Sequence, residues 1–379
     1  MVSHLLPDYS GGSLVNLMAS LVAACGGTPA HRVLKDASLE KARNIVLLIV
    51  DGLGDNFLAR HGAGGELARR RASAITSVFP STTASAITTS YTGRTPLEHG
   101  LTGWFTYFGE AGCVGAPLPF RSRGDNASLR ERGFTPEHAF TSGSIFGEIP
   151  IRSIVVTHKD IVDSDYNLRH CVGAERRAYA TLDEWVSQVE AAVKSSSERK
   201  FIYTYWPDYD AASHRYGCES PEALRALGDI DAAFGRLLAR LSGTESLVVA
   251  TADHGFIDAE DCLEPPPEIS SMLRFPLCGE RRVAYCHVHS SEEFVKRSKD
   301  WLRDRADVRP SRELVAEGWF GPGAPHARFA ERVGDVAIVM RGRHTVKDWT
   351  PGEPRSLHIG NHGGTSEDEM LIPLILETT

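Results

Sequence analysis

The chain has 379 residues, of which 42% are hydrophobic, enough for one large domain with an insertion or for two domains. The formal net charge is −8 and no basic block occurs, which argues against binding a nucleic-acid polymer through a cationic face. Seven scattered cysteines without a C-x-x-C pair indicate neither a disulfide framework nor a thiolate zinc cluster. We expect reduced thiols in a cytoplasmic protein.

The first structured segment is apolar. Residues 14–25 are expected to form an amphipathic helix with Ser13 as its N-cap. No Lys or Arg precedes this segment, whereas a signal peptide needs a basic leading region. No apolar run approaches about 18 residues, so no membrane span and no membrane partner are predicted.

Strand-like and helical patterns then alternate along the chain. The run Asn44–Val50 is continuously apolar, as expected for a strand buried on both faces. The alternation predicts an α/β fold with a mainly parallel sheet flanked by helices. Pro373 favours an edge or irregular position for the last strand. Further strands are expected at 74–79, 154–157, 200–206, 246–251 and 370–376, and helices at 83–91, 174–194 and 221–241.

The regular alternation stops after Phe256. Residues 261–276 contain three consecutive prolines and are typical of a loop. Beyond it we expect strands at 282–289 and 335–340 and a helix at 291–305. The sequence therefore predicts a catalytic core made of residues 1–261 and 351–379. Residues 262–350 would form a smaller inserted α+β cap subdomain.

Acidic and histidine residues follow two of the apolar runs. Asp51 comes directly after Asn44–Val50, and Asp253–His254 comes just after the run that ends at Thr251. An Asp-Gly pair alone is usually turn chemistry. Because the carboxyl ends of parallel strands meet at one edge of a sheet, these side chains are nevertheless plausible neighbours.

Two further segments carry ligand-like residues. Asp210 and His214 are four positions apart, so both face the same way on a helical turn. Asp208 is a rival to Asp210. His362 lies in a glycine-rich loop, with His358 as the nearby alternative.

A nucleophile candidate lies in the small-residue segment that follows Pro80. A hydroxyl at the N-terminus of a helix sits at the positive end of the helix dipole, where phosphate oxygens also bind. A metal ion can lower the pKa of such a hydroxyl. The simpler alternative is that Ser81, Thr82 and Thr83 only cap the helix.

Taken together, these segments resemble the alkaline phosphatase superfamily, and most closely its type I phosphodiesterase/nucleotide pyrophosphatase branch, which includes phosphonoacetate hydrolases. The resemblance covers most of the chain, from Asp51 to about Met370. Thr83 matches the nucleophile better than Thr82, since it lies nine residues before Thr92 of a Thr-Gly pair. The resemblance implies two divalent ions, with Zn²⁺ favoured and Mn²⁺ or Fe as alternatives. One ion would be held by Asp51, Thr83, Asp253 and His254, and the other by Asp210, His214 and His362.

One position departs from the family pattern. Nucleotide pyrophosphatases carry an Asn shortly after a His-Gly pair that steadies a phosphate oxygen, and Trp104 stands at about that point here. The phosphate pocket must therefore be built differently, and Arg121 or Arg123 would be the substitute donor. The segment also offers aromatic surface for a base or ring, from Trp104, Phe105, Tyr107 and Phe108, with core packing as the expected use of at least two of them.

The resemblance implies metal-dependent hydrolysis of a small phosphorylated substrate such as a nucleotide. A phosphodiester or pyrophosphate bond is favoured, with attack by Thr83 and a phosphothreonine intermediate. A phosphomonoesterase or a phosphonate hydrolase would use the same two-metal site. A catalytically silent, metal-containing protein that binds phosphate esters is the non-enzymatic alternative.

Overall fold

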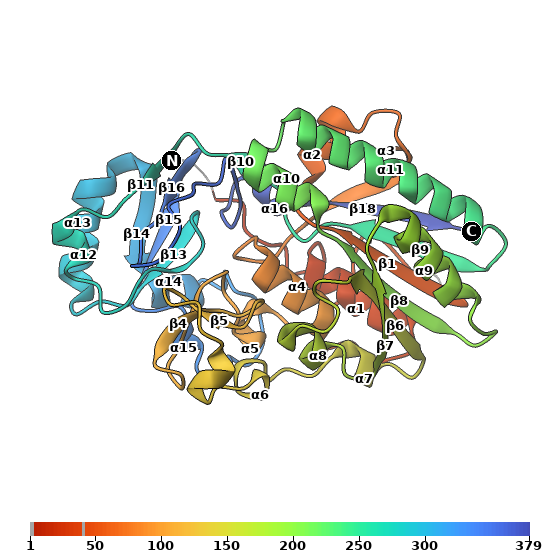
Figure 1. The fold of residues 1–379 in the computed structure, drawn as a ribbon, viewed down its shortest axis with the longest axis horizontal. Coiled ribbons are helices and arrows are strands. Elements are labelled where there is room, and N and C mark those ends of the chain that lie inside the picture. Colours follow the sequence, from red (N-terminus) through yellow and green to blue (C-terminus); the bar gives the residue numbers. More distant parts are fainter. Residues whose placement is uncertain (1–3, 40–41) are drawn as a thin grey trace.

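The computed structural model describes residues 4–39 and 42–379, and its centre is a seven-stranded sheet in the order β2-β18-β9-β1-β8-β6-β7 (Figure 1). The five strands from β9 to β7 are parallel to their neighbours, whereas β18 runs antiparallel to both β2 and β9. The predicted α/β fold with a mainly parallel sheet is confirmed. The strands are β1 (Asn44–Val50), β2 (Arg71–Thr76), β6 (Arg152–His158), β7 (Ala174–Tyr179), β8 (Lys200–Trp206), β9 (Ser246–Thr251) and β18 (Leu371–Thr378).

Helices cover both faces of this sheet, with α10 and α11 on one side and α1 and α4 on the other (Figure 1). Helix α11 is amphipathic and starts at the predicted place, with Ser220 as its N-cap and Pro221 at its first position. The longer helices are α1 (Leu14–Ala24), α4 (Thr83–Thr92), α9 (Leu182–Lys194), α10 (Asp208–Tyr216) and α11 (Pro221–Leu241). The shorter ones are α2 (Asp55–His61), α3 (Glu66–Arg69), α5 (Pro96–His99), α6 (Pro136–Ala139), α7 (Ile145–Glu148), α8 (Asp165–His170) and α16 (Glu367–Met370).

The first helix differs from its prediction in one respect. Ser13 caps α1 as expected and forms a capping box with Asn16. Ten of its eleven residues are buried, however, so the helix is enclosed on all sides and not amphipathic. It packs against α4, the helix that begins at Thr83.

The predicted helix over 174–194 is wrong in its first part, because β7 occupies Ala174–Tyr179 and only the remainder is helical as α9. Parallel pairing with β6 outweighs the helix propensity of this charged stretch. Thr181 accepts a hydrogen bond from the Glu184 N–H and thereby starts α9.

The two antiparallel strands also deviate from expectation. Strand β2 spans Arg71–Thr76, three residues earlier than the predicted 74–79. Strand β18 lies inside the sheet, but its pairing with β9 begins only at Ile375 and its register with β2 shifts just before that residue. Pro373 therefore lies where only β2 pairs with the strand, which agrees with the predicted irregularity.

A second lobe stands at the left of Figure 1. Its four-stranded antiparallel sheet has the order β12-β13-β15-β14 and covers its own hydrophobic clusters. The parallel pair β11 (Asp261–Leu263) and β16 (His344–Val346) brings the two ends of this segment together. The boundaries 262–350 remain a prediction. The other elements are β12 (Cys278–Gly279), β13 (Val283–Cys286), β14 (Ala306–Pro310), β15 (Val336–Met340), α12 (Pro267–Ser270), α13 (Ser291–Leu302), η2 (Arg303–Arg305), α14 (Ser311–Ala316) and α15 (Phe329–Arg332).

A small three-stranded sheet, which the sequence did not predict, is formed by the segment between α5 and α6. The backbone of Phe105 pairs with that of Gly279, and so joins this segment to the second lobe. The remaining elements are β3 (Thr106–Phe108), β4 (Cys113–Ala116), β5 (Arg121–Ser122), η1 (Leu129–Arg132), β10 (Ile257–Asp258) and β17 (Gly360–Asn361). Across the described ranges, no helix is long and apolar enough to cross a bilayer.

A buried ion pair fastens the second lobe to the core. Arg282, next to β13, donates from Nε and Nη2 to the two carboxylate oxygens of Glu369 in α16, each at 3.0 Å. Both side chains are almost fully buried, with 1% and 0% of their surface exposed. Glu369 also accepts from the Gly364 N–H, and so connects the loop that carries His362.

We expect Arg282→Met to reduce the free energy of unfolding by about 3–5 kcal/mol, because it leaves the Glu369 carboxylate buried without its partner. Denaturant unfolding of the wild-type protein and of the variant measures the loss of free energy. The double variant Arg282→Met/Glu369→Gln should lose less than the single one. The exposed pair Arg297–Glu293 provides the control, and Arg297→Met should leave the unfolding midpoint unchanged. An equal loss in the single and double variants would contradict the pairing argument.

Candidate functional site

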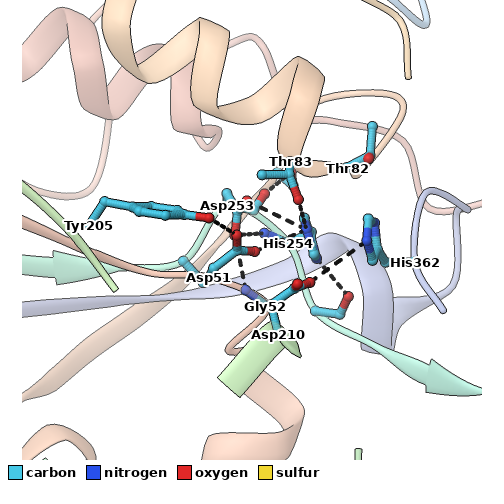
Figure 2. A network of polar contacts seen from close by, with 12 residues as sticks. Asp51, Gly52, Thr82, Thr83, Tyr205, Asp210, Asp253, His254 and His362 are labelled. Carbon is cyan, nitrogen blue, oxygen red and sulfur yellow. Dashed lines mark hydrogen bonds and ion pairs between the residues drawn. The ribbon is translucent and has the colours of Figure 1, made fainter. Parts of the chain in front are cut away.

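Four side chains meet where β1, β9 and α4 come together. Asp51 directly follows β1, Asp253 and His254 follow β9, and Thr83 is the first residue of α4. His254 is central, as Figure 2 shows. Its Nε2 lies 3.3 Å from Asp51 Oδ1, 3.4 Å from Asp253 Oδ2 and 3.1 Å from Thr83 Oγ1.

A second group lies beside the first. Asp210 is in the first turn of α10, His214 is one turn later, and His362 follows β17. The Asp210 Oδ1 atom is 3.4 Å from His214 Nε2 and 3.8 Å from His362 Nε2. The two imidazole Nε2 atoms are 3.2 Å apart. The His362 ring stacks on His254 with centroids 3.7 Å apart, so the two groups are continuous.

Backbone carbonyls set the orientation of two imidazoles. His214 Nδ1 lies 2.9 Å from Gly360 O, and His254 Nδ1 lies 3.1 Å from Gly255 O. An Nδ1–H that donates to a carbonyl leaves Nε2 with a free lone pair. Both Nε2 atoms therefore point into the cluster as potential ligands.

The carboxylates are held in a similar way. Asp253 Oδ1 accepts from the N–H groups of Gly52 and His254, each at 3.0 Å. The Tyr205 hydroxyl donates to Asp51 Oδ2 (Figure 2). The second oxygen of each carboxylate faces the imidazoles without a hydrogen-bond partner, and Asp210 Oδ1 is buried and unpartnered as well.

Three carboxylates in one buried cluster are electrostatically unfavourable without a cation. Burial raises the pKa of Asp51, and the neighbouring Asp253 and Asp210 raise it further. Burial also raises the pKa of Asp210. Two sets of ligand atoms, each within 4.8 Å of one another, are Asp51, Asp253 and His254, and Asp210, His254 and His362. Orphaned carboxylate oxygens beside free imidazole nitrogens fit divalent metal ions.

The structure distinguishes between the two neighbouring threonines. Thr83 lines the cavity with its hydroxyl toward His254, whereas Thr82 is fully buried and donates to Glu280 Oε1 at 2.5 Å. Thr82 is also the N-cap residue of α4. The α4 N-terminus thus presents the Thr83 hydroxyl to the cluster at the positive end of the helix dipole.

The cavity beside the cluster has a volume of about 330 Å³ and reaches into the second lobe. Trp104 lines it, is 39% exposed, and donates its backbone N–H to Glu280 Oε1 at 2.7 Å. Arg123 also lines the cavity, but its guanidinium already forms ion pairs with Asp348 and Glu353, at 2.8 and 3.1 Å.

Some sequence candidates lie elsewhere. Arg121 is exposed, donates to Asn126 O and does not line the cavity. Asp208 lines a different surface hollow. His358 lines the same cavity as His214, with ring centroids 4.3 Å apart, and, like His214, it belongs to neither of the two sets of ligand atoms.

Glu280 and Tyr205 were not anticipated from the sequence. Tyr205 lies in β8 opposite Ile49 of β1, so only the parallel register places its hydroxyl at Asp51. Glu280 comes from the turn after β12 in the second lobe, where a charged residue carries no signal of its own. The interlobe packing brings it to Thr82.

Residues 45–364 match the family model described as type I phosphodiesterase / nucleotide pyrophosphatase. The chain belongs to this family. It is therefore a member of the alkaline phosphatase superfamily and one of the metal-dependent phosphoester hydrolases. No curated protein sequence matches the chain significantly.

Solved structures support the same fold. Murine ectonucleotide pyrophosphatase/phosphodiesterase 5 is similar with a TM-score of 0.65 and 15% identity over 87% of each chain. An inactive variant of that protein was solved in complex with AMP (TM-score 0.64, 14% identity, 87% of each chain). Phosphonoacetate hydrolase from Sinorhizobium meliloti, in complex with phosphonoformate, is similar with a TM-score of 0.64 and 18% identity over 88% of this chain and 90% of that one.

We expect divalent ions to stabilise the protein, because they supply the counter-charge for the buried carboxylates. At a hundredfold excess over Kd, one bound ion adds about 2.7 kcal/mol. The Asp51→Asn variant should be more stable than wild type after chelation and should gain less from added zinc. Thermal unfolding with and without zinc measures both effects, and calorimetric titration gives the number of ions. A variant less stable than wild type when both are metal-free would contradict this electrostatic argument.

Proposed function

We propose that this chain is a two-metal hydrolase of phosphodiester or pyrophosphate bonds that acts through a phosphothreonine intermediate on Thr83. The observation that carries the proposal is the Thr83 hydroxyl, 3.1 Å from His254 Nε2 at the start of α4, facing the cavity and the carboxylate–imidazole cluster. A hydroxyl in this setting matches an activated nucleophile.

The two ions would be held by the side chains already grouped. Asp51, Thr83, Asp253 and His254 would hold one, and Asp210, His214 and His362 the other. When bound, divalent ions such as Zn²⁺, or alternatively Mn²⁺ or Fe, supply Lewis acidity toward the phosphoryl oxygens and lower the pKa of the bound hydroxyl. The titration described above is expected to end at two equivalents.

In the proposed reaction, Thr83, the N-terminus of α4 and Thr82 have different roles. Thr83 Oγ1 loses its proton and forms a bond to phosphorus, while the bond from phosphorus to the leaving-group oxygen breaks. Water subsequently cleaves the bond from phosphorus to Oγ1 and restores the Thr83 hydroxyl. The N-terminus of α4 favours the anionic phosphoryl group throughout. Thr82, which donates to Glu280, is committed to holding the loop.

The substrate is proposed to be a small phosphorylated compound such as a nucleotide. AMP in the murine structure and phosphonoformate in the bacterial one support small phosphorus ligands on this fold. Trp104 and Phe105 line the cavity and would stack on a base or ring. A phosphonate hydrolase that uses the same residues is the second candidate.

Thr83→Ala is expected to abolish turnover of bis(p-nitrophenyl) phosphate because the nucleophile is removed, while the zinc content stays the same because Asp51, Asp253 and His254 remain to hold that ion. Thr83→Ser should keep measurable activity because it retains a hydroxyl. Thr82→Ala is the matched control and should remain active. If Thr83→Ala kept a rate within about tenfold of wild type, under ~1.4 kcal/mol of barrier, direct attack by water would replace this mechanism. If wild-type protein bound phosphate esters without turnover, the silent binding protein would be favoured.

We expect the diester to be hydrolysed faster than p-nitrophenyl phosphate. A monoester dianion needs an additional cation near the nucleophile. Helix α4 has none, Arg123 is neutralised by two carboxylates, and the group beside Thr82 is Glu280. Steady-state kinetics with saturating zinc compares the two esters. A kcat/KM for the monoester at least tenfold above that of the diester would move the protein to the phosphomonoesterases.

A further inference from the structure

One wall of the cavity, formed by the second lobe and the segments next to it, carries several charges. Arg123, Arg281 and Lys347 line it together with Asp348 and Glu353. Such a wall faces whatever part of a substrate extends away from the phosphorus atom. An unpaired charge on this wall would therefore favour leaving groups of the opposite charge.

Two of the three cations are already compensated. Arg123 is bonded to Asp348 and to Glu353, at 2.8 and 3.1 Å. Lys347 Nζ lies 2.5 Å from Glu353 Oε1 and over the Trp349 ring. These two cations and two carboxylates form a neutral, closed network with little attraction left for a ligand.

Arg281 is different. In the described ranges 4–39 and 42–379, no carboxylate lies within ion-pair distance of its guanidinium, and the one side-chain hydrogen bond recorded runs from Nη2 to Ser356 O at 3.3 Å. Burial lowers its pKa, which reflects the cost of removing the charge from water. A guanidinium has five N–H donors in a planar fork that suits a carboxylate or phosphoryl group.

We propose that Arg281 binds a second anionic group of the substrate, a carboxylate or a second phosphoryl group, on the side remote from the attacked phosphorus. This inference rests on the proposed function and narrows its substrate class. The substrates would be phosphorus compounds with an anion close to the phosphorus, such as compounds with a pyrophosphate bond or carboxylated phosphonates. Arg281 would be a specificity-determining residue.

The test compares ligands that differ only in the second anion. Calorimetry on zinc-loaded protein measures Kd for methylphosphonate, for phosphonoacetate, which adds a carboxylate, and for methylenediphosphonate, which adds a second phosphonate. The wild-type protein should bind phosphonoacetate or methylenediphosphonate, the two ligands with a second anionic group, at least tenfold more tightly than methylphosphonate. The preferred ligand tells which anion Arg281 takes.

Arg281→Ala should remove this preference and leave the Kd for methylphosphonate unchanged, which also demonstrates an intact fold. Arg281→Lys should retain part of the preference. Arg355→Ala is the matched control, because Arg355 is an exposed arginine of the facing segment that does not line the cavity. A preference that persists in Arg281→Ala, or its absence from wild type, would overturn the inference.

The outcome is separable from that of the proposed function. Turnover of bis(p-nitrophenyl) phosphate with no effect of Arg281 on ligand preference would leave the hydrolase standing and remove only this inference. An Arg281-dependent ligand preference in a protein that turns over no ester would support the anion site and contradict the proposed hydrolase activity.

Discussion

The structure depends on the burial of three carboxylates at one point. Asp51, Asp210 and Asp253 lie together with oxygen atoms that no donor within residues 4–39 and 42–379 satisfies, and burial raises the pKa of the first two. An uncompensated buried charge is among the most expensive features a fold can carry. Orphaned carboxylate oxygens beside imidazole nitrogens fit divalent cations as the compensating charge.

Rigid elements hold these groups in place. The three carboxylates and the imidazoles of His214 and His254 extend from β1, β9 and α10, whose backbones are fixed by the parallel ladder and by helix packing. Hydrogen bonds from Tyr205 and from the Gly52 N–H leave Asp51 and Asp253 each with one oxygen toward the imidazoles. Such support determines the geometry of a metal site as much as the ligands do.

The second lobe completes the site rather than merely covering it. Glu280 reaches Thr82 and the Trp104 backbone, Arg281 lines the cavity, and Arg282 anchors the lobe on Glu369. Three consecutive residues thus link the N-terminus of α4, the cavity and the core. A change of leaving group in this family can accordingly be achieved in the lobe, while the chemistry stays at the sheet edge.

The sequence by itself determined the α/β class and most strands of the central sheet, because buried parallel strands are continuous apolar runs such as Asn44–Val50. Short motifs at strand ends and helix starts also carry local signals, and the family resemblance built on them singled out Asp51, Thr83, Asp210, His214, Asp253, His254 and His362. Only the tertiary structure brought these seven side chains together in space.

Tertiary structure alone decided three further points. It converted 174–179 into strand β7, because pairing with β6 outweighs local propensity. It places Arg121 outside the cavity and pairs Arg123 with two acids distant in the sequence, Asp348 and Glu353. It also brought Glu280 and Arg281 to the site. Contacts between segments separated by some two hundred residues have no local sequence signature, since packing between lobes, and not periodicity, creates them.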